Sequence, residues 1–219
     1  MSSVDRSQFP SRALFGLIAR VFVYAILLAL IAAGMLWGAV EYGPLFYDET
    51  GPVEILESVF ALVTALIFLF AGRLDCRRAS FVSLLAMVLF CAVIRESDYF
   101  LDELVGRHTW KILVGLVVVF IIFHIRRNLK SILDSLMDFI SQPSFGVFMS
   151  GVLVLLVFSR LFGCGFFWKE LIKGEYYYVI KTIAEESVEQ MGYFLMLVAS
   201  CEYLILVRVG VRRREETAV

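Results

Sequence analysis

Long apolar segments follow one another along nearly the whole chain. A helix needs about 18 or more consecutive apolar residues to cross the hydrocarbon core of a bilayer. The pattern predicts six such helices, over residues 14–42, 53–72, 79–101, 110–125, 145–163 and 184–207. Only short connections remain between them, so no separate soluble domain fits. We expect an all-α, polytopic membrane protein with one transmembrane domain over residues 14–207, flanked by short tails at 1–13 and 208–219.

Residues 126–141 depart from this pattern because apolar and charged positions alternate at helical spacing. The apolar positions that share one face are Leu129, Ile132, Leu133, Leu136, Met137 and Ile140. Lys130, Asp134 and Asp138 lie elsewhere on the helix, and Pro143 marks its end. This arrangement predicts an interfacial amphipathic helix between the fourth and fifth spans, resting on lipid as a spacer.

Composition supports the membrane class. The chain has 219 residues, of which 60% are hydrophobic, and its mean hydropathy is +0.84. The first apolar run, Val21–Val40, exceeds the roughly 7–15 residues of a signal-peptide core, and no A-x-A cleavage pattern follows it. We therefore expect the first span to remain in the protein.

The basic residues predict an orientation. Thirteen of the 20 gather at the end of the bundle that holds both termini: Arg6, Arg12, Arg20, Arg73, Arg77, Arg78, Arg126, Arg127, Lys130, Arg208, Arg212, Arg213 and Arg214. Because cytoplasmic loops carry an excess of lysine and arginine, both termini are expected in the cytoplasm of a multi-pass protein of the inner, or cell, membrane.

The acidic residues gather at the opposite end, which this orientation places outside. Fourteen of the 21 lie there: Glu41, Asp48, Glu49, Glu54, Glu57, Glu96, Asp98, Asp102, Glu103, Glu170, Glu175, Glu185, Glu186 and Glu189. Acidic residues contribute little to topology, so their clustering is information about function.

The segment Ile94–Lys111 concentrates these charges at the end of the third span. On a continuous helix, Arg95, Asp98 and Asp102 are spaced i, i+3 and i+7 and share one face. Charged groups at the end of an apolar span are costly unless partners or water meet them. We expect charges from the other spans to converge on the same place and form an outer-facing carboxylate and arginine site.

Residue chemistry suggests roles within that site. The candidate catalytic residues are Glu57, Asp98, Asp102, His108 and Glu189. The candidate substrate-binding residues are Arg95, Tyr99, Trp110, Lys111 and Arg160, and arginines beside the carboxylates suit a phosphate or carboxylate head group. The candidate ligands of a divalent cation are Glu54, Glu57, Glu186 and Glu189.

Three interpretations of the cluster remain open. The favoured one is a small membrane-embedded enzyme or binding protein for a lipid or lipid-linked polar group, assisted by a divalent cation as candidate cofactor. The second is a cation- or proton-linked transporter, although few polar residues lie in the inner halves of the spans. The third is a structural ion-pair network that holds the helices together, as in an assembly factor.

Other function classes lack their motifs. There is no H-E-x-x-H, and two histidines cannot build a histidine-rich zinc site. Glu185-Glu186 resembles the start of the E-E-x-x-x-R motif of intramembrane glutamic proteases, but Gln190 stands where the arginine is required. The four cysteines do not form an outer pair, so no disulfide is expected. The basic tails are too short to argue for nucleic-acid binding, and the oligomeric state stays open.

Overall fold

The computed structural model describes residues 11–48, 50–172, 174 and 176–217, and within these ranges the chain forms helices and no strand. Six helical segments are long and apolar enough to cross a membrane. The predicted fold class is therefore confirmed at that level. The first ten residues of the predicted tail, together with Glu49, Lys173 and Glu175, lie outside the described residues.

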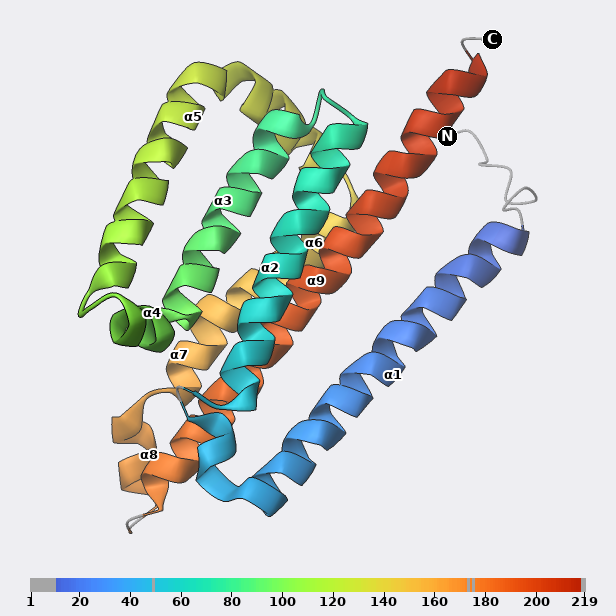
Figure 1. Cartoon of the computed structure of the whole chain (residues 1–219). Helices are drawn as coiled ribbons and strands as arrows, with labels where there is room; N and C mark the ends of the chain where they lie inside the picture. Colours follow the sequence, from blue (N-terminus) through green and yellow to red (C-terminus); the bar gives the residue numbers. More distant parts are fainter. Residues whose placement is uncertain (1–10, 49, 173, 175, 218–219) are drawn as a thin grey trace.

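Five long helices carry most of the chain back and forth along the bundle (Figure 1). They are α1 (Ser11–Tyr42), α2 (Pro52–Leu74), α3 (Ala79–Glu96), α5 (Thr109–Ile140) and α9 (Tyr177–Thr217). The sixth crossing is composite: α6 (Pro143–Leu153), a π-helical turn η3 (Val154–Phe158) and α7 (Ser159–Phe162). The 3-10 helix η2 (Gly43–Tyr47) and the short helices α4 (Asp98–Leu104) and α8 (Gly165–Leu171) all lie toward one end.

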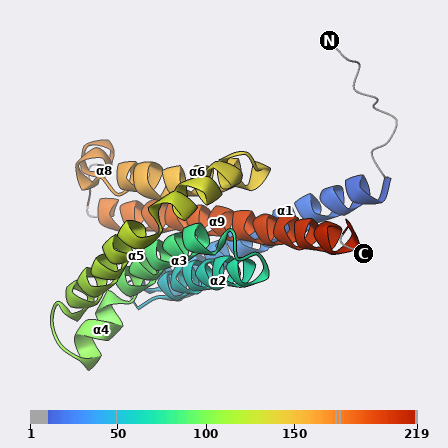
Figure 2. The same cartoon turned by 90° about the horizontal axis from the view of Figure 1, so that it is seen from above.

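The core forms where α2 packs against α3 and α9, and α6 packs against α9. The view down the bundle shows α9 running between the α2–α3 pair and the α6–α8 segment (Figure 2). At one point α6 and α9 approach with their backbones almost in contact. A Cβ atom built on Gly151 would lie 2.7 Å from the carbonyl oxygen of Gly192. Small residues permit this close helix crossing, as they do in membrane bundles generally.

The segment expected on the membrane surface is partly core. Residues 126–140 continue α5 beyond a kink at Asn128, whose φ of −122° is not helical. Phe139 is 1% exposed, and its ring lies 5.3–6.3 Å, centroid to centroid, from the rings of Phe68, Phe81, Phe145, Phe148 and Tyr203. Leu129, Leu133 and Met137 remain exposed, so one face is free to meet lipid. The segment is not merely a spacer, and its interfacial position stays a prediction.

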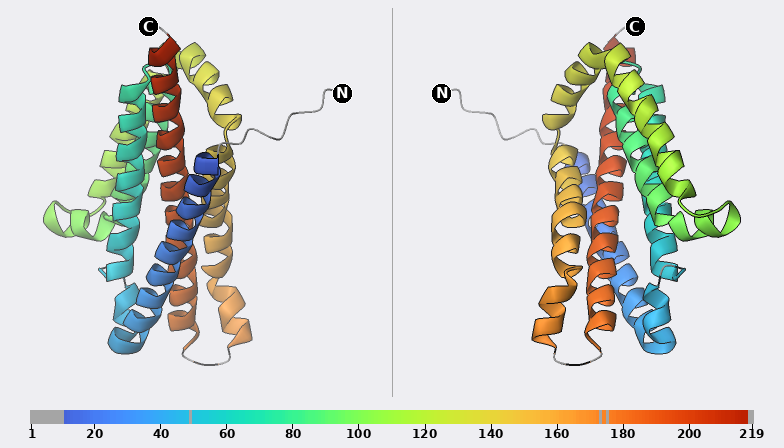
Figure 3. Two further views of the ribbon diagram at one scale, coloured as in Figure 1. Left: turned by 90° about the vertical axis from the view of Figure 1, so that its right-hand side faces the viewer. Right: turned by 90° about the vertical axis from the view of Figure 1, so that its left-hand side faces the viewer.

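Helix α1 stands apart from this core. Its apolar window has no buried residues, and it touches the bundle mainly through η2 and a few positions of α9. The side views show it crossing the bundle obliquely along one face (Figure 3). The start of α1 and the end of α9 lie toward the same end, as six crossings require.

Two predicted helix boundaries are wrong. The third span does not continue to residue 101, because the helix ends at Glu96 and a new short helix, α4, starts at Asp98. The sixth span begins at Tyr177 rather than at residue 184. Because of the break at Ser97, Arg95, Asp98 and Asp102 do not share one continuous helical face.

Candidate functional site

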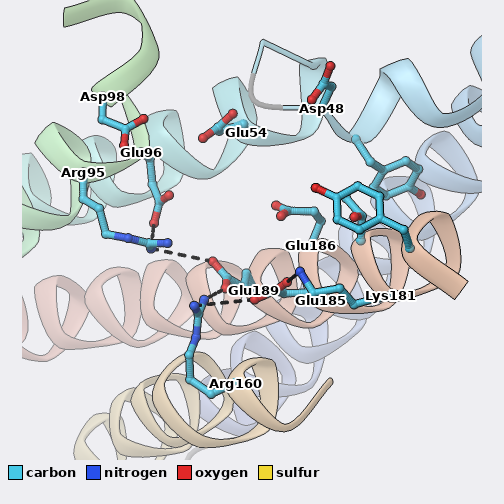
Figure 4. Close-up of a pocket in the computed structure, with 13 residues that line it drawn as sticks. Asp48, Glu54, Arg95, Glu96, Asp98, Arg160, Lys181, Glu185, Glu186 and Glu189 are labelled. Carbon is cyan, nitrogen blue, oxygen red and sulfur yellow. Dashed lines mark hydrogen bonds and ion pairs between the residues drawn. The ribbon is translucent and has the colours of Figure 1, made fainter. Parts of the chain in front are cut away.

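A polar pocket of ≈ 240 Å³ opens at the end of the bundle that carries most of the acidic residues. Its charged lining consists of Asp48, Glu54, Arg95, Glu96, Asp98, Arg160, Lys181, Glu185, Glu186 and Glu189, and Tyr47, Tyr178 and Thr182 complete it. Figure 4 shows these side chains converging from the start of α9, the end of α3, α7 and the α2 region. Seven carboxylates thus meet three basic groups.

Ion pairs join three of the helices around the pocket. Arg95 at the end of α3 donates to Glu96, with 2.8 Å between Nη1 and Oε1. Its Nη1 also lies 3.9 Å from the nearer oxygen of Glu189 on α9. From the other side, Arg160 of α7 donates to Glu189 (Figure 4). These contacts tie α3 and α7 to the same carboxylate of α9.

Local helix geometry explains why α9 supplies so much of the pocket. Lys181, Glu185 and Glu189 recur every four residues and therefore lie along one face. Lys181 Nζ lies 2.7 Å from Glu185, and Arg160 Nη1 lies 3.5 Å from the same side chain. The π-helical turn Val154–Phe158 directly precedes Ser159 and Arg160. Such a turn widens the helix and changes the direction of the residues that follow, and it is frequent at functional sites.

Three carboxylates form a buried triad beneath the pocket. Glu57, Glu96 and Glu189 are all buried, and each offers one oxygen that lies within 4.8 Å of the others'. Tyr193, also buried, donates its hydroxyl to Glu96 Oε1 over 2.6 Å. Glu57 has no exposed surface, and neither of its oxygens has a hydrogen-bond partner. A bare ionised carboxylate in such a place is costly, so the triad calls for a proton or a cation.

The donor set of the triad is compatible with a hard divalent cation, because Ca²⁺ and Mg²⁺ prefer carboxylate oxygens. The charge balance points the other way. The guanidinium groups of Arg95 and Arg160 already face two of the three carboxylates, which leaves one negative charge on the triad as a whole. One proton shared with Glu57 would neutralise it. The oxygen donors of the triad therefore suit a metal ion, whereas its net charge of one favours a single proton.

Several residues predicted for the site do meet at the pocket. Those that line it are Glu54, Arg95, Asp98, Arg160, Glu186 and Glu189, and Glu57 lies buried beside Glu96 and Glu189. The proposed metal ligands Glu54 and Glu186 are in the pocket lining, whereas the buried triad contains Glu96 in their place.

The structure does not place the remaining predicted residues in the pocket. Asp102 and Tyr99 belong to α4, which projects sideways from the bundle (Figure 3). His108 precedes α5 in a left-handed conformation with φ of 70°, and the ammonium of Lys111 lies over the ring of Trp110. None of these five lines the pocket. The placement of Asp102 beside Arg95 assumed a helix that continues past Glu96, and the roles proposed for all five residues stay predictions.

Other pocket residues carried no clear signal in the sequence. Tyr47 and Asp48 come from the η2 turn and the residue after it, which join the end of α1 to α2. Lys181 and Thr182 were not expected on a helix, because the predicted sixth span began later. Tyr193 lies four residues after Glu189, and this spacing could have indicated a hydroxyl on the same face.

The opposite end of the bundle is organised by pairing. Asp75, which is 7% exposed, lies 3.3 Å from Arg78 Nε and 3.2 Å from Arg214 Nη1. Within the last span, Glu202 binds Arg20 over 2.7 Å and accepts a hydrogen bond from Tyr24 over 2.8 Å. Among the described residues, Glu202 is the main carboxylate within a span that could serve a cation path on that side, and Arg20 and Tyr24 already bind it.

Comparison with known proteins adds no family: no protein-family model, curated protein or solved structure matches this chain. The fold and the site define a class by themselves. In the part of the chain that the structure describes, the protein is all-helical, with six helices long and apolar enough to span a membrane and a buried acidic group beneath a charged pocket at one end.

Proposed function

We propose that this protein is a membrane-embedded binding protein or enzyme for the polar group of a lipid or a lipid-linked molecule. The observation that carries the proposal is the charged pocket at the end of the spanning-length helices, where seven carboxylates face three basic side chains. A network that served only to hold helices together would be expected to balance its charges. Among the described residues, Asp98 and Glu186 line the open pocket without an ion pair.

The surroundings of the pocket favour a ligand that arrives from the membrane. Tyr178, at its rim, is 63% exposed. Tyrosine is typical of the membrane–water boundary, where one end of the side chain is apolar and the other is wet. A ligand with its polar group in the pocket would therefore keep its apolar part in contact with lipid.

The chemistry available beneath the pocket is proton transfer. Glu57, Glu96 and Glu189 each offer an oxygen within 4.8 Å of the others', a separation that one bridging water or substrate hydroxyl spans, and the hydroxyl of Tyr193 donates to Glu96. Paired carboxylates of this kind act as acid and base when one is kept protonated by its neighbours. Arg95 and Arg160 hold two of these carboxylates in place and offer guanidinium groups to an anionic part of the ligand.

The test is retention of a polar lipid by the purified protein. Wild type, Glu186→Gln and Glu103→Gln would be extracted in mild detergent, and bound lipids would be identified by native mass spectrometry. Glu186 lines the pocket, whereas Glu103 is an exposed acid on α4, so the same substitution is made at matched places inside and outside the pocket. Melting temperatures would establish that each variant is folded.

We expect wild type and Glu103→Gln to retain a polar lipid or lipid-linked molecule, and Glu186→Gln to retain at least about tenfold less, the cost of one charge-assisted hydrogen bond. Equal retention by all three folded proteins would overturn the proposal and leave the structural ion-pair network.

A further inference from the structure

An apolar groove lies between α1 and α9. Its volume is ≈ 430 Å³, and its lining includes Leu28, Ala32, Met35 and Ala39 of α1 and Ile183 and Gln190 of α9. At one end α1 is held to α9 by the bonds of Arg20 and Tyr24 to Glu202. At the other end η2 packs between the two helices. The groove is the space between these two attachments.

One polar side chain inside this groove has nothing to bind. Gln190 is 2% exposed, and neither its amide nitrogen nor its oxygen has a hydrogen-bond partner. A buried amide without partners is costly, and most buried amides in folded proteins are satisfied. A ligand that brings an oxygen acceptor or a hydroxyl into the apolar groove would satisfy Gln190. A purely hydrocarbon occupant would not.

The groove leads toward the charged pocket. A smaller cavity of ≈ 170 Å³ shares Tyr47 and Ile183 with the groove, and it shares Tyr47, Asp48, Tyr178 and Thr182 with the pocket. Tyr47 therefore borders all three spaces. Its hydroxyl donates to the carbonyl oxygen of Met35 over 3.1 Å, which fixes the ring at the junction.

The length of the groove suits one leaflet of a bilayer. Residues 28–39 of α1 extend about 16 Å at 1.5 Å per residue. One leaflet contributes about 15 Å of the roughly 30 Å hydrocarbon core. A lipid with its polar group at the pocket would place its chain along this length.

We propose that the groove holds one acyl chain of a phospholipid whose head group carries an ammonium ion, with that head group in the charged pocket. The carboxylates of Asp98 and Glu186, which line the pocket without an ion pair, complement the ammonium, and the basic groups of the pocket complement the phosphate. The linkage between chain and head group passes Gln190, whose amide binds an ester oxygen. This inference rests on the proposed function and specifies its ligand class.

The experiment uses the whole protein in lipid nanodiscs that contain phosphatidylethanolamine and phosphatidylglycerol together, in equal amounts. Native mass spectrometry after release measures which lipid stays bound. Ala32→Phe would fill the groove. Ala33→Phe, one residue along α1, is the matched control, because Ala33 is exposed and does not line the groove. Gln190→Leu removes the amide without leaving a buried polar group.

We expect wild type and Ala33→Phe to retain one phosphatidylethanolamine in preference to phosphatidylglycerol. Ala32→Phe should retain at least about tenfold less lipid because its ring fills the groove. Gln190→Leu should also retain at least about tenfold less, the equivalent of one lost hydrogen bond to a buried group. Gln190→Leu should keep or raise the melting temperature, because it removes unsatisfied polar atoms. Retention by Ala32→Phe equal to that by Ala33→Phe would overturn the inference, as would a preference for phosphatidylglycerol.

A water-soluble head group separates this inference from the proposed function. Glycerophosphoethanolamine has no acyl chain, so it should bind Ala32→Phe as it binds wild type and should bind Glu186→Gln more weakly. If Ala32→Phe still retains the lipid while Glu186→Gln loses the soluble head group, only the groove is disproved. If neither variant changes binding of the lipid or of the head group, both proposals fail.

Discussion

The two ends of the helix bundle carry charge in opposite ways. At the basic end, Asp75 is surrounded by Arg78, Arg214 and the backbone N–H of Arg77, and Arg78 also reaches Asp138 over 2.7 Å. At the acidic end, Glu57 is equally buried and has no hydrogen-bond partner. Both ends place carboxylates in the bundle, but only one provides each buried carboxylate with a cation.

This contrast teaches what to expect of a buried carboxylate in each place. One that is matched by arginine and backbone donors holds loops and helix ends together. A buried carboxylate without a cationic partner beneath a pocket needs a proton, a metal ion or a bound ligand to offset its charge. Stability and function should therefore respond to different substitutions at the two ends.

The largest effect expected is all-or-none and concerns which end is outside. A reporter that is active only outside the cytoplasm should be active when fused after Arg107, at the acidic end. It should be silent when fused after Cys76 or Lys130, at the basic end, because basic loops remain in the cytoplasm. Reporter activity in the reverse pattern would place the pocket on the cytoplasmic side and exclude a ligand from the outer leaflet.

Asp75→Asn should cost more stability than Glu186→Gln. It removes the charge that Arg78 and Arg214 share, and we expect a loss of about 2 kcal/mol in the free energy of unfolding, as for a hydrogen bond to a charged group, while Arg78 keeps its contact with Asp138. Glu186→Gln should cost less than about 1 kcal/mol, as expected for a group without a matched partner. Denaturant unfolding of both variants in the same detergent provides the measurement.

An equal loss of stability in the two variants would mean that both ends are structural networks.

Glu57→Gln should change how stability depends on pH. If a proton neutralises the triad, the folded state binds one more proton than the unfolded state, and wild-type stability falls as pH rises from about 4.3, the ordinary pKa of glutamate, toward alkaline pH. Glutamine at position 57 carries no charge at any pH, so the variant should lose most of this dependence. Melting temperatures across that range provide the measurement.

Divalent cations supply the contrasting outcome for Glu57. A melting temperature that rises with millimolar Ca²⁺, Mg²⁺ or Mn²⁺, returns with a chelator, and is unresponsive in Glu57→Gln would identify a bound cation by mass action on the folded state. Asp138→Asn, at the basic end, is the control and should keep the wild-type response.

The smallest effect is expected at the acidic end but outside the pocket, in the connection from α4 to α5. His108→Gln and Lys111→Gln alter residues that do not line the pocket, and each should change stability by less than about 0.5 kcal/mol. Polar-lipid retention should equal that of wild type. Loss of retention in His108→Gln would return this histidine to the site and would imply that α4 and the following turn move onto the pocket.

The site was predictable as a region but not as a set of contacts. Helix ends at Glu54, Arg95, Arg160 and Glu186 could be assigned to one side because each follows or precedes an apolar span of membrane length. The prediction that Asp102 shares a helical face with Arg95 depended on a continuous helix. The chain breaks at Ser97, where no proline or glycine lies, and the local sign of the break is a serine followed by Asp98, a pattern typical of a helix start.

The sequence alone determined the all-helical class, the six spanning segments and the segregation of acids from bases, because these depend on the length and composition of local runs. Tertiary structure decided which charges are matched. Arg78, three residues from Asp75, is a partner that the sequence could indicate, but Arg214 reaches Asp75 from the far end of α9. Glu57 lies among apolar residues of α2 in the sequence and meets the carboxylates of Glu96 and Glu189 only in the folded chain. Partners from distant helices set the electrostatic environment of a buried group, and those partners exist only once the helices have packed.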